Sequence, residues 1–361
     1  MRLAFWIPRS NHLKILAPVA RMARSRGHER LALYPLASLR GPKDDIVPGG
    51  GMDSLADPFG PAIGIADEVD AEIHLRDVDW AVAVGLRTAE GIRAYTRASG
   101  VKWAALDSCG DNLLYVLEYG DAVLKEWDCV TTLAPEPRDA AAAWSLEPVG
   151  YPELDQLALP GMTREACRAK WNLPAEGKII LFAPAARPAN LTRFGRWWWG
   201  WHDYPFIVQQ VRQFADRHGA FLLTKTRIKH RDPAWLTGLS DRYVGETCYY
   251  PFDLLELLVA SDLVVGGFAS AMAIEAAAVG RPQVWLHAWP PERSEWPRML
   301  PLRRPFFSDL GGLWNHAGAR TIPCYGPRWR EPLRHWADWG AWPILSDSAR
   351  GQNSHALTRW A

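Results

Sequence analysis

The sequence lacks several features that would place it in a specialised class of protein. It has no run of about 18 apolar residues, the length that a membrane-spanning helix needs. The apolar run after Met1 is short and carries no cleavage site, so we expect a cytoplasmic protein without a signal peptide or a transmembrane segment. Charge of one sign is not in excess, since 41 Lys and Arg oppose 40 Asp and Glu. This balance argues against a general attraction to nucleic acid.

Cysteine is scarce and shows no metal-binding spacing. The five cysteines are scattered, odd in number and without a CxxC pair, which is typical of reduced thiols in a cytoplasm; they are Cys109, Cys129, Cys167, Cys248 and Cys324. We therefore predict no metal site.

Tryptophan, by contrast, is abundant: the chain has 20, clustered at 197–201, 285–296 and 329–342. Aromatic faces stack on sugars and bases, and they also pack between surface elements. For the Trp-rich loop at 194–201, the composition leaves ligand binding and packing over a domain joint both open.

Length and periodicity together indicate two domains. At 361 residues the chain exceeds the size at which one hydrophobic core usually keeps growing. Apolar strand-like runs alternate with amphipathic helical patterns, which is typical of parallel sheets with crossover helices. We predict an α/β protein of two Rossmann-like, doubly wound domains facing each other across a cleft. They span residues 1–150 and 151–328, and a helix crossing back and a tail follow at 329–361.

Two segments read as irregular connections. Residues 40–67 are rich in Gly and Pro and have no sustained periodicity, so we expect a long loop there. Residues 147–157, with the sequence EPVGYPELDQL, are expected to form a turn-rich connection between the domains.

The strongest candidate site is the segment LVVGGFASAMAIEAAAVGRPQVWL. A strand is followed by Gly266 and Gly267, by Ser270 at the start of an Ala-rich helix, and by Glu275 inside that helix. The glycines permit close backbone approach, and a helix N-terminus attracts a diphosphate. Glu275 can accept hydrogen bonds from ribose hydroxyls. A tight structural turn with a solvated Glu275 is the alternative interpretation.

This segment resembles the donor-binding signature of the glycosyltransferase B-type fold, in which such a turn and helix are followed by Gly-x-Pro and a strand. Gly280 and Pro282 match that ending. The segments VGYPELD at 149–155 and KIILFAPAARP at 178–188 resemble the CDP-glycerol glycerophosphotransferase branch of these enzymes. The chain departs from that branch at 267–271 and 226–227, which places glycerol phosphate as the transferred group in doubt. The resemblance implies a nucleotide-diphosphate sugar as donor, no metal and no further cofactor. It also implies that residues 1–150 form an acceptor domain and that residues 151–328 form a nucleotide-donor domain.

Basic side chains follow two strands of the predicted donor domain. Lys225 and Arg227 follow one strand, and Arg187 follows the strand before it. Cations at strand ends can neutralise the charge that develops on a leaving nucleoside diphosphate. A solvated basic loop and a surface salt bridge are the alternative interpretations.

The N-terminal half offers a candidate base. His12 follows the first strand, and its unperturbed pKa suits removal of a proton from an acceptor hydroxyl. Asp107 ends a later strand and can orient His12, with Asp111 as the competing carboxylate. A capping or surface role is the alternative for His12.

These observations favour a glycosyltransferase that moves a sugar from a nucleotide-diphosphate donor to a hydroxyl acceptor on a glycan, a lipid-linked molecule or a nucleic-acid base. A polyol-phosphate transferase, a nucleotide-sugar epimerase and a phage-type DNA glycosyltransferase remain open. So does a noncatalytic nucleotide- or glycan-binding protein, because a fold alone does not prove an activity.

Overall fold

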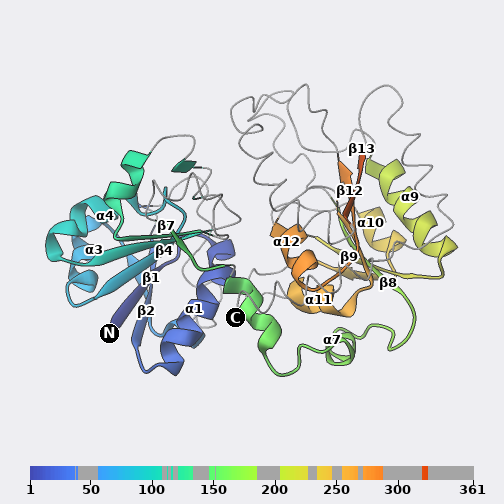
Figure 1. Cartoon of the computed structure of the whole chain (residues 1–361), viewed down its shortest axis with the longest axis horizontal. Helices are drawn as coiled ribbons and strands as arrows, with labels where there is room; N and C mark the ends of the chain where they lie inside the picture. Colours follow the sequence, from blue (N-terminus) through green and yellow to red (C-terminus); the bar gives the residue numbers. More distant parts are fainter. Residues whose placement is uncertain are drawn as a thin grey trace. The chain divides into compact units, whose positions relative to one another are not determined.

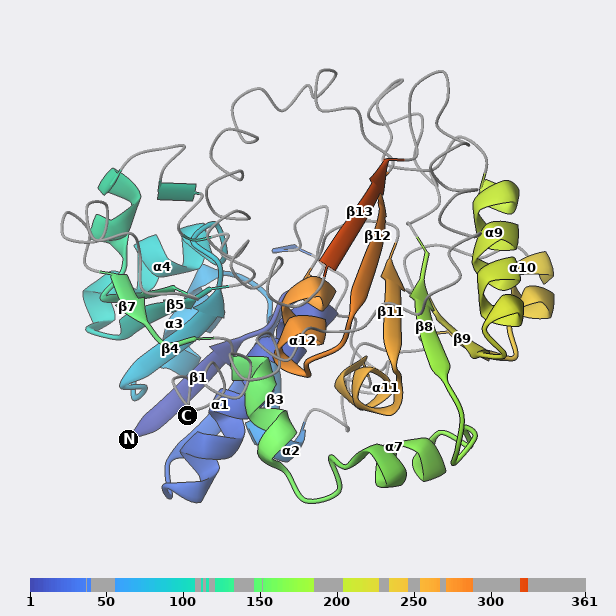
Figure 2. The ribbon, with the colours of Figure 1, turned by 45° about the vertical axis from the view of Figure 1, so that its right-hand side comes forward.

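The chain divides into two compact units, the first comprising Met1–Asp155 and the second beginning at Gln156. Each unit is built on one sheet of parallel strands (Figures 1 and 2). The computed structural model describes residues 1–36, 38–39, 56–107, 112, 115–116, 121–132, 146–150, 152–184, 204–226, 234–245, 254–266, 271–287 and 319–323. The Trp-rich loop at 194–201 and the helix expected after residue 329 lie outside these residues.

The first sheet has the strand order β3-β2-β1-β4-β5-β6-β7. Its strands are β1 (Arg2–Trp6), β2 (Glu29–Pro35), β3 (Ala62–Ile65), β4 (Trp80–Val84), β5 (Lys102–Leu106), β6 (Cys129–Thr132) and β7 (Leu146–Pro148). From β1 the chain adds β2 and β3 on one side, and it then adds β4 to β7 in order on the other side. The switch point of this doubly wound sheet therefore lies between β1 and β4, where ligands of such sheets usually bind.

Helices cover both faces of the first sheet. On one face, α1 (Leu13–Ser25) and α2 (Ala56–Phe59) pack over an apolar layer that includes Phe5 and Phe59. On the other face, α3 (Glu68–Leu75) and α4 (Glu90–Thr96) pack over a layer that includes Trp103 and Trp127. The strands are apolar on both sides, as parallel strands between two helical layers must be.

The second sheet has the strand order β10-β9-β8-β11-β12-β13. Its strands are β8 (Ile179–Ala183), β9 (Phe221–Lys225), β10 (Arg242–Val244), β11 (Leu263–Gly266), β12 (Gln283–His287) and β13 (Ala319–Pro323). Here the switch point lies between β8 and β11. Both sheets are thus doubly wound and parallel, which confirms the predicted fold class.

Helices also lie on both sides of the second sheet (Figure 2). One side carries α9 (Tyr204–Arg217) and α10 (Ala234–Leu239), whose Phe214 and Leu236 belong to the main core of this unit. The other side carries α11 (Leu254–Ala260) and α12 (Ala271–Ala278). The short helix α7 (Arg164–Lys170) packs against α11, and the Thr163 side chain caps it by accepting a hydrogen bond from the Ala166 N–H.

Two expectations about irregular segments are wrong in part. The segment expected as a loop at 40–67 contains α2 and β3, and β3 pairs with β2. The connection expected at 147–157 begins inside β7 and then forms a 3₁₀ helix, η5 (Pro152–Ala158). Main-chain hydrogen bonds rather than side-chain pattern define these short elements, so their periodicity is weak.

Candidate functional site

Three strands of the second sheet end level with one another at its switch point. The register pairs Gly266 with Ala183 and Thr224 with Phe182, so Lys225 is level with Ala183. Neighbouring strands lie about 4.8 Å apart, which places the main chains of Lys225 and Gly266 about 10 Å apart. We call this row, formed by Lys225, Ala183 and Gly266, the donor edge. Two of the predicted site residues, Lys225 and Gly266, therefore lie at the same end of the same sheet.

Lys225 is buried at the donor edge rather than extended into solvent. Its side chain has only 6% of its surface exposed, and Nζ donates a hydrogen bond to the Thr226 carbonyl at 3.4 Å. The next residue, Thr226, shares a hydrogen bond of 2.8 Å with the Tyr243 hydroxyl. A lysine held this way presents a charge of restricted position, which suits neutralisation of a phosphate better than a mobile surface lysine does.

Gly266 has a second reason to be glycine, one that the sequence did not reveal. A Cβ at this position would lie 2.0 Å from Cζ3 of Trp285, on the neighbouring strand β12. Trp285 is fully buried, and its indole N–H donates to the Gln283 side chain at 3.0 Å. The absent side chain of Gly266 therefore makes room for an indole of the core.

Helix α12 begins at Ala271, within five residues of the end of β11. Its amino end therefore lies close to the donor edge, and a helix N-terminus favours an anion. Glu275 lies in this helix with no exposed surface, so the alternative interpretation of a solvated side chain is wrong. Gly267, Ser270, Arg187 and Arg227, the remaining predicted donor residues, lie outside the described residues.

In the first unit, His12 occupies the turn between β1 and α1. It ends the 3₁₀ helix η1 (Ser10–His12) and stands at the N-cap of α1, with its main-chain N–H bonded to the Arg9 carbonyl at 3.0 Å. Its side chain is buried, with 4% of its surface exposed. Because β1 borders the switch point, His12 lies at the edge where ligands of doubly wound sheets bind.

Asp107 lies at the same edge of the same sheet, directly after β5 and with one strand between it and β1. It is buried, its N–H donates to Thr131 Oγ1 at 2.9 Å, and its Oδ1 accepts from the Asn112 N–H at 3.1 Å. Neither Thr131 nor Asn112 belongs to a sequence motif, so no pattern in the sequence points to them. Asp111, the competing carboxylate, lies outside the described residues.

A buried ion pair joins η5 to the start of α1. Lys14 Nζ lies 2.8 Å from Oε1 of Glu153, whose side chain has no exposed surface. Glu153 belongs to the segment VGYPELD, and Lys14 lies two residues after His12. The connection between the units is therefore anchored beside the candidate base.

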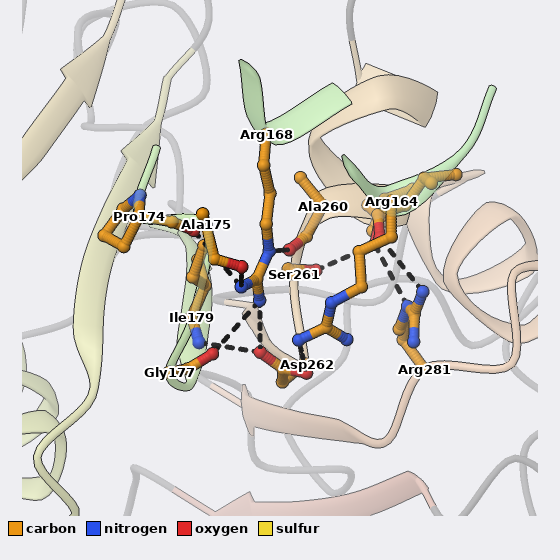
Figure 3. Close-up of polar contacts among 12 residues, drawn as sticks. Arg164, Arg168, Pro174, Ala175, Gly177, Ile179, Ala260, Ser261, Asp262 and Arg281 are labelled. Carbon is orange, nitrogen blue, oxygen red and sulfur yellow. Dashed lines mark hydrogen bonds and ion pairs between the residues drawn. The ribbon is translucent and has the colours of Figure 1, made fainter. Parts of the chain in front are cut away.

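Buried polar groups also gather at the opposite edge of the second sheet (Figure 3). The Arg168 guanidinium donates to four main-chain carbonyls, those of Pro174, Ala175, Gly177 and Ala260, and to Asp262 Oδ2 at 2.9 Å. Asp262 also accepts from the Ile179 N–H at 2.8 Å and pairs with Arg164 at 2.5 Å.

We call Arg164, Arg168, Asp262 and Arg281 the arginine hub. Burial lowers the pKa of both Arg168 and Arg281 from the usual arginine value. Ile179 begins β8 and Asp262 precedes β11, so the hub lies at the amino ends of the strands, away from the donor edge. Arg281 donates to the carbonyls of Leu258 and Val259 at 3.2 and 3.0 Å, so Arg168 and Arg281 both bind main-chain carbonyls, which indicates a structural role.

Membrane-spanning helices and metal-binding clusters are both absent from the described residues. No helix among them is long and apolar enough to cross a membrane. They contain no group of three or more His, Cys, Asp or Glu side chains placed to hold a metal ion.

Comparison with solved structures identifies the architecture. The glycotransferase of kitacinnamycin matches with a TM-score of 0.57 at 14% identity, over 100% of this chain and 95% of that one. MurG from Acinetobacter baumannii matches with a TM-score of 0.54 at 11% identity, over 98% and 95%. The chain has the glycosyltransferase B-type fold. UDP-N-acetylglucosamine 2-epimerase from Rickettsia bellii is also similar, with a TM-score of 0.55 at 10% identity over 100% and 95%.

This fold is shared by transferases and an epimerase, so the fold by itself does not choose between their reactions. No protein-family model and no curated protein sequence matches the chain. The choice therefore depends on the site residues.

Proposed function

We propose that the protein is a glycosyltransferase that moves a sugar from a nucleotide-diphosphate donor to a hydroxyl acceptor. The observation that carries the proposal is the donor edge, where buried Lys225 lies level with Gly266 and close to the amino end of α12. A buried cation and a helix N-terminus together favour a diphosphate group. Glu275, one turn inside that helix, is assigned to the ribose hydroxyls.

The reaction divides between the two units. The bond between the sugar C1 and the diphosphate oxygen breaks, and its electron pair leaves with the nucleoside diphosphate, whose charge Lys225 stabilises. The acceptor oxygen forms the new bond to C1, and its proton passes to the His12 imidazole. Asp107 stabilises the imidazolium that results. In this scheme the second unit binds the donor and the first activates the acceptor.

A thermal-shift screen against UDP, CDP, GDP, ADP and dTDP tests donor binding, because a ligand that binds only the folded protein raises Tm. We expect one nucleotide to raise Tm in the wild type and to lose most of this effect in Lys225→Ala and Glu275→Gln. Lys178→Ala is the matched control, since Lys178 is exposed and precedes β8 at the other edge of the sheet. If the variants respond as the wild type does to every nucleotide, the assignment of the donor edge is wrong.

Turnover assays with the sugar forms of that nucleotide test the reaction. His12→Ala should lower kcat by roughly 10²- to 10⁴-fold, the usual contribution of a general base, while donor affinity stays unchanged. His28→Ala, in the turn after α1, serves as the control. Survival of His12→Ala within about threefold of the wild type would assign His12 a structural role.

The epimerase alternative is favoured by one specific observation, the similarity to UDP-N-acetylglucosamine 2-epimerase. Product analysis separates the reactions. A transferase releases free nucleoside diphosphate in proportion to the glycosylated acceptor. An epimerase gives an isomeric sugar with no acceptor present. CDP-glycerol in the same assay tests transfer of a polyol phosphate.

A further inference from the structure

The carboxylate of Asp107 is fixed by residues from two places in the first unit. Thr131, in β6, accepts the Asp107 main-chain N–H at 2.9 Å through its hydroxyl. Asn112 donates its own main-chain N–H to Asp107 Oδ1 at 3.1 Å. The first hydrogen bond restrains the main chain of Asp107 and the second restrains its carboxylate. The side chain of Asp107 is therefore held at its base and at its tip.

Asn112 is itself held in place by its side chain. Its Nδ2 donates to the Ala105 carbonyl at 3.3 Å and to the Thr131 carbonyl at 3.1 Å, so the amide bridges β5 and β6. Since Nδ2 has two carbonyl acceptors, these contacts also fix the orientation of the amide. Asn112 has no exposed surface, and Thr131 has 4% exposed. Bonds of this kind in a dry environment are stronger and more restrictive than on a surface.

We propose that Thr131 and Asn112 are positioning residues that set the geometry of Asp107 for proton transfer at His12. The inference rests on the proposed function, because it assigns them to the step in which Asp107 stabilises the imidazolium. Neither residue touches the reacting atoms. A displacement of about 1 Å in a catalytic constellation can cost about 100-fold in rate, so residues that fix such a carboxylate affect kcat rather than donor binding.

Two adjacent threonines in β6 provide a matched experiment. Thr131 and Thr132 are both buried, and successive side chains of a strand point to opposite faces. Thr131→Val removes the hydroxyl that contacts Asp107, whereas Thr132→Val makes the same change one residue away. We expect Thr131→Val to lower kcat about tenfold or more with the donor KM unchanged, and Thr132→Val to stay within about twofold.

Thr131→Ser restores the hydroxyl and should recover most of the lost kcat. Equal kcat values for Thr131→Val and Thr132→Val would overturn the proposal. So would a Thr131→Ser variant as slow as Thr131→Val, because return of the hydroxyl would then not restore the rate.

A second measurement does not depend on turnover. The ¹³Cγ signal of Asp107 in protein labelled at aspartate is identified by its loss in Asp107→Asn and is then followed against pH by NMR. An N–H hydrogen bond favours the ionised carboxylate. Asn112→Ala, which frees the main chain that donates this bond, should therefore raise the midpoint of the Asp107 titration. Thr132→Val should leave the midpoint unchanged.

The two measurements separate the possible failures. If the Asp107 midpoint moves in Asn112→Ala but no nucleotide sugar is turned over, the positioning role stands and the proposed transferase reaction is wrong. If the midpoint is the same in all variants, Asn112 does not hold the carboxylate and the positioning proposal is wrong.

Discussion

Among single residues, Gly266 is constrained by the core as well as by its place in the proposed donor site. It ends β11 at the switch point of the second sheet, and the Trp285 indole occupies the space that any side chain would need. The sequence by itself predicts only that this glycine lets a diphosphate approach the main chain closely. The contact with Trp285 depends on the pairing of β11 with β12, and no local pattern specifies that register.

Gly266→Ala should therefore lower the free energy of unfolding by about 1–3 kcal/mol, the usual cost of overpacking a core. Urea unfolding followed by circular dichroism measures this change. Gly238→Ala is the control, because Gly238 lies in α10 with open space around its Cα and should be neutral or slightly stabilised. A Gly266→Ala variant with the midpoint of the wild type would show that Trp285 moves aside without cost.

A second prediction at this scale concerns Cys167. Burial raises the pKa of its thiol above the usual value, and the nearby Glu256 raises it further. A raised pKa means that less thiolate is present at any given pH, and thiolate is the reactive form. We expect alkylation by iodoacetamide at neutral pH to be slow at Cys167 in the folded protein and fast after denaturation. Peptide mapping by mass spectrometry reads out this site separately, and rapid labelling under native conditions would contradict the prediction.

At the scale of helices and strands, the arginine hub joins α7 to the amino ends of β8 and β11. Arg168→Met removes the donors of four main-chain carbonyls and one partner of Asp262, so we expect a loss of about 3 kcal/mol in the free energy of unfolding.

Arg164→Met is the matched control for this prediction. Its side chain is 34% exposed and makes one ion pair with the same aspartate, which is worth about 1 kcal/mol or less. Urea titration of both variants gives the comparison. Equal losses would mean that the charge near Asp262, rather than the bonds to the carbonyls, carries the stability.

The strands predicted ahead of the candidate site residues are β1, β5, β8, β9 and β11, and all of them lie inside their sheets. The strands β3 and β7 form the edges of the first sheet, and β10 and β13 form the edges of the second. A central parallel strand is covered on both faces and must be continuously apolar, as in the stretch IILFA of β8. An edge strand such as RYV in β10 has one neighbour and needs no such run. The position of an edge strand depends on its pairing with the neighbouring strand, and the periodicity of its own sequence does not reveal that pairing.

The same limit applies to the site. His12, Asp107, Lys225 and Gly266 could be selected from the sequence because each follows an apolar strand, and strand ends of a parallel sheet share one edge. Thr131, Asn112 and the pair of Lys14 with Glu153 could not, because their contacts join segments that are 5 to 139 residues apart in the chain. Only the folded main chain brings such groups together.

For the whole molecule, the proposed function divides the chemistry between the two sheets. Each sheet has its own core and its own switch point, with the candidate base on one and the candidate phosphate-binding lysine on the other. Binding of the proposed donor should then protect mainly the second unit from hydrogen exchange.

Hydrogen exchange with mass spectrometry tests this expectation. The nucleotide that raises Tm should slow amide exchange in peptides covering 221–226 and 263–278, because binding to the native state suppresses local opening. Peptides from β6 and β7 provide the internal comparison. Protection confined to the first unit would place the nucleotide on the wrong sheet and contradict the assignment of Lys225 and Glu275.

The ion pair of Lys14 with Glu153 bears on how this protein can be recombined with others of its fold. Exchange of one half between two enzymes, to combine the donor of one with the acceptor of another, requires a junction. A junction at residue 150 would pair Lys14 with whatever residue the foreign half carries at position 153, and a largely buried lysine without its carboxylate is costly. Residues 152–158 should therefore come from the same protein as the first unit, and hybrids made in this way should be the ones that fold.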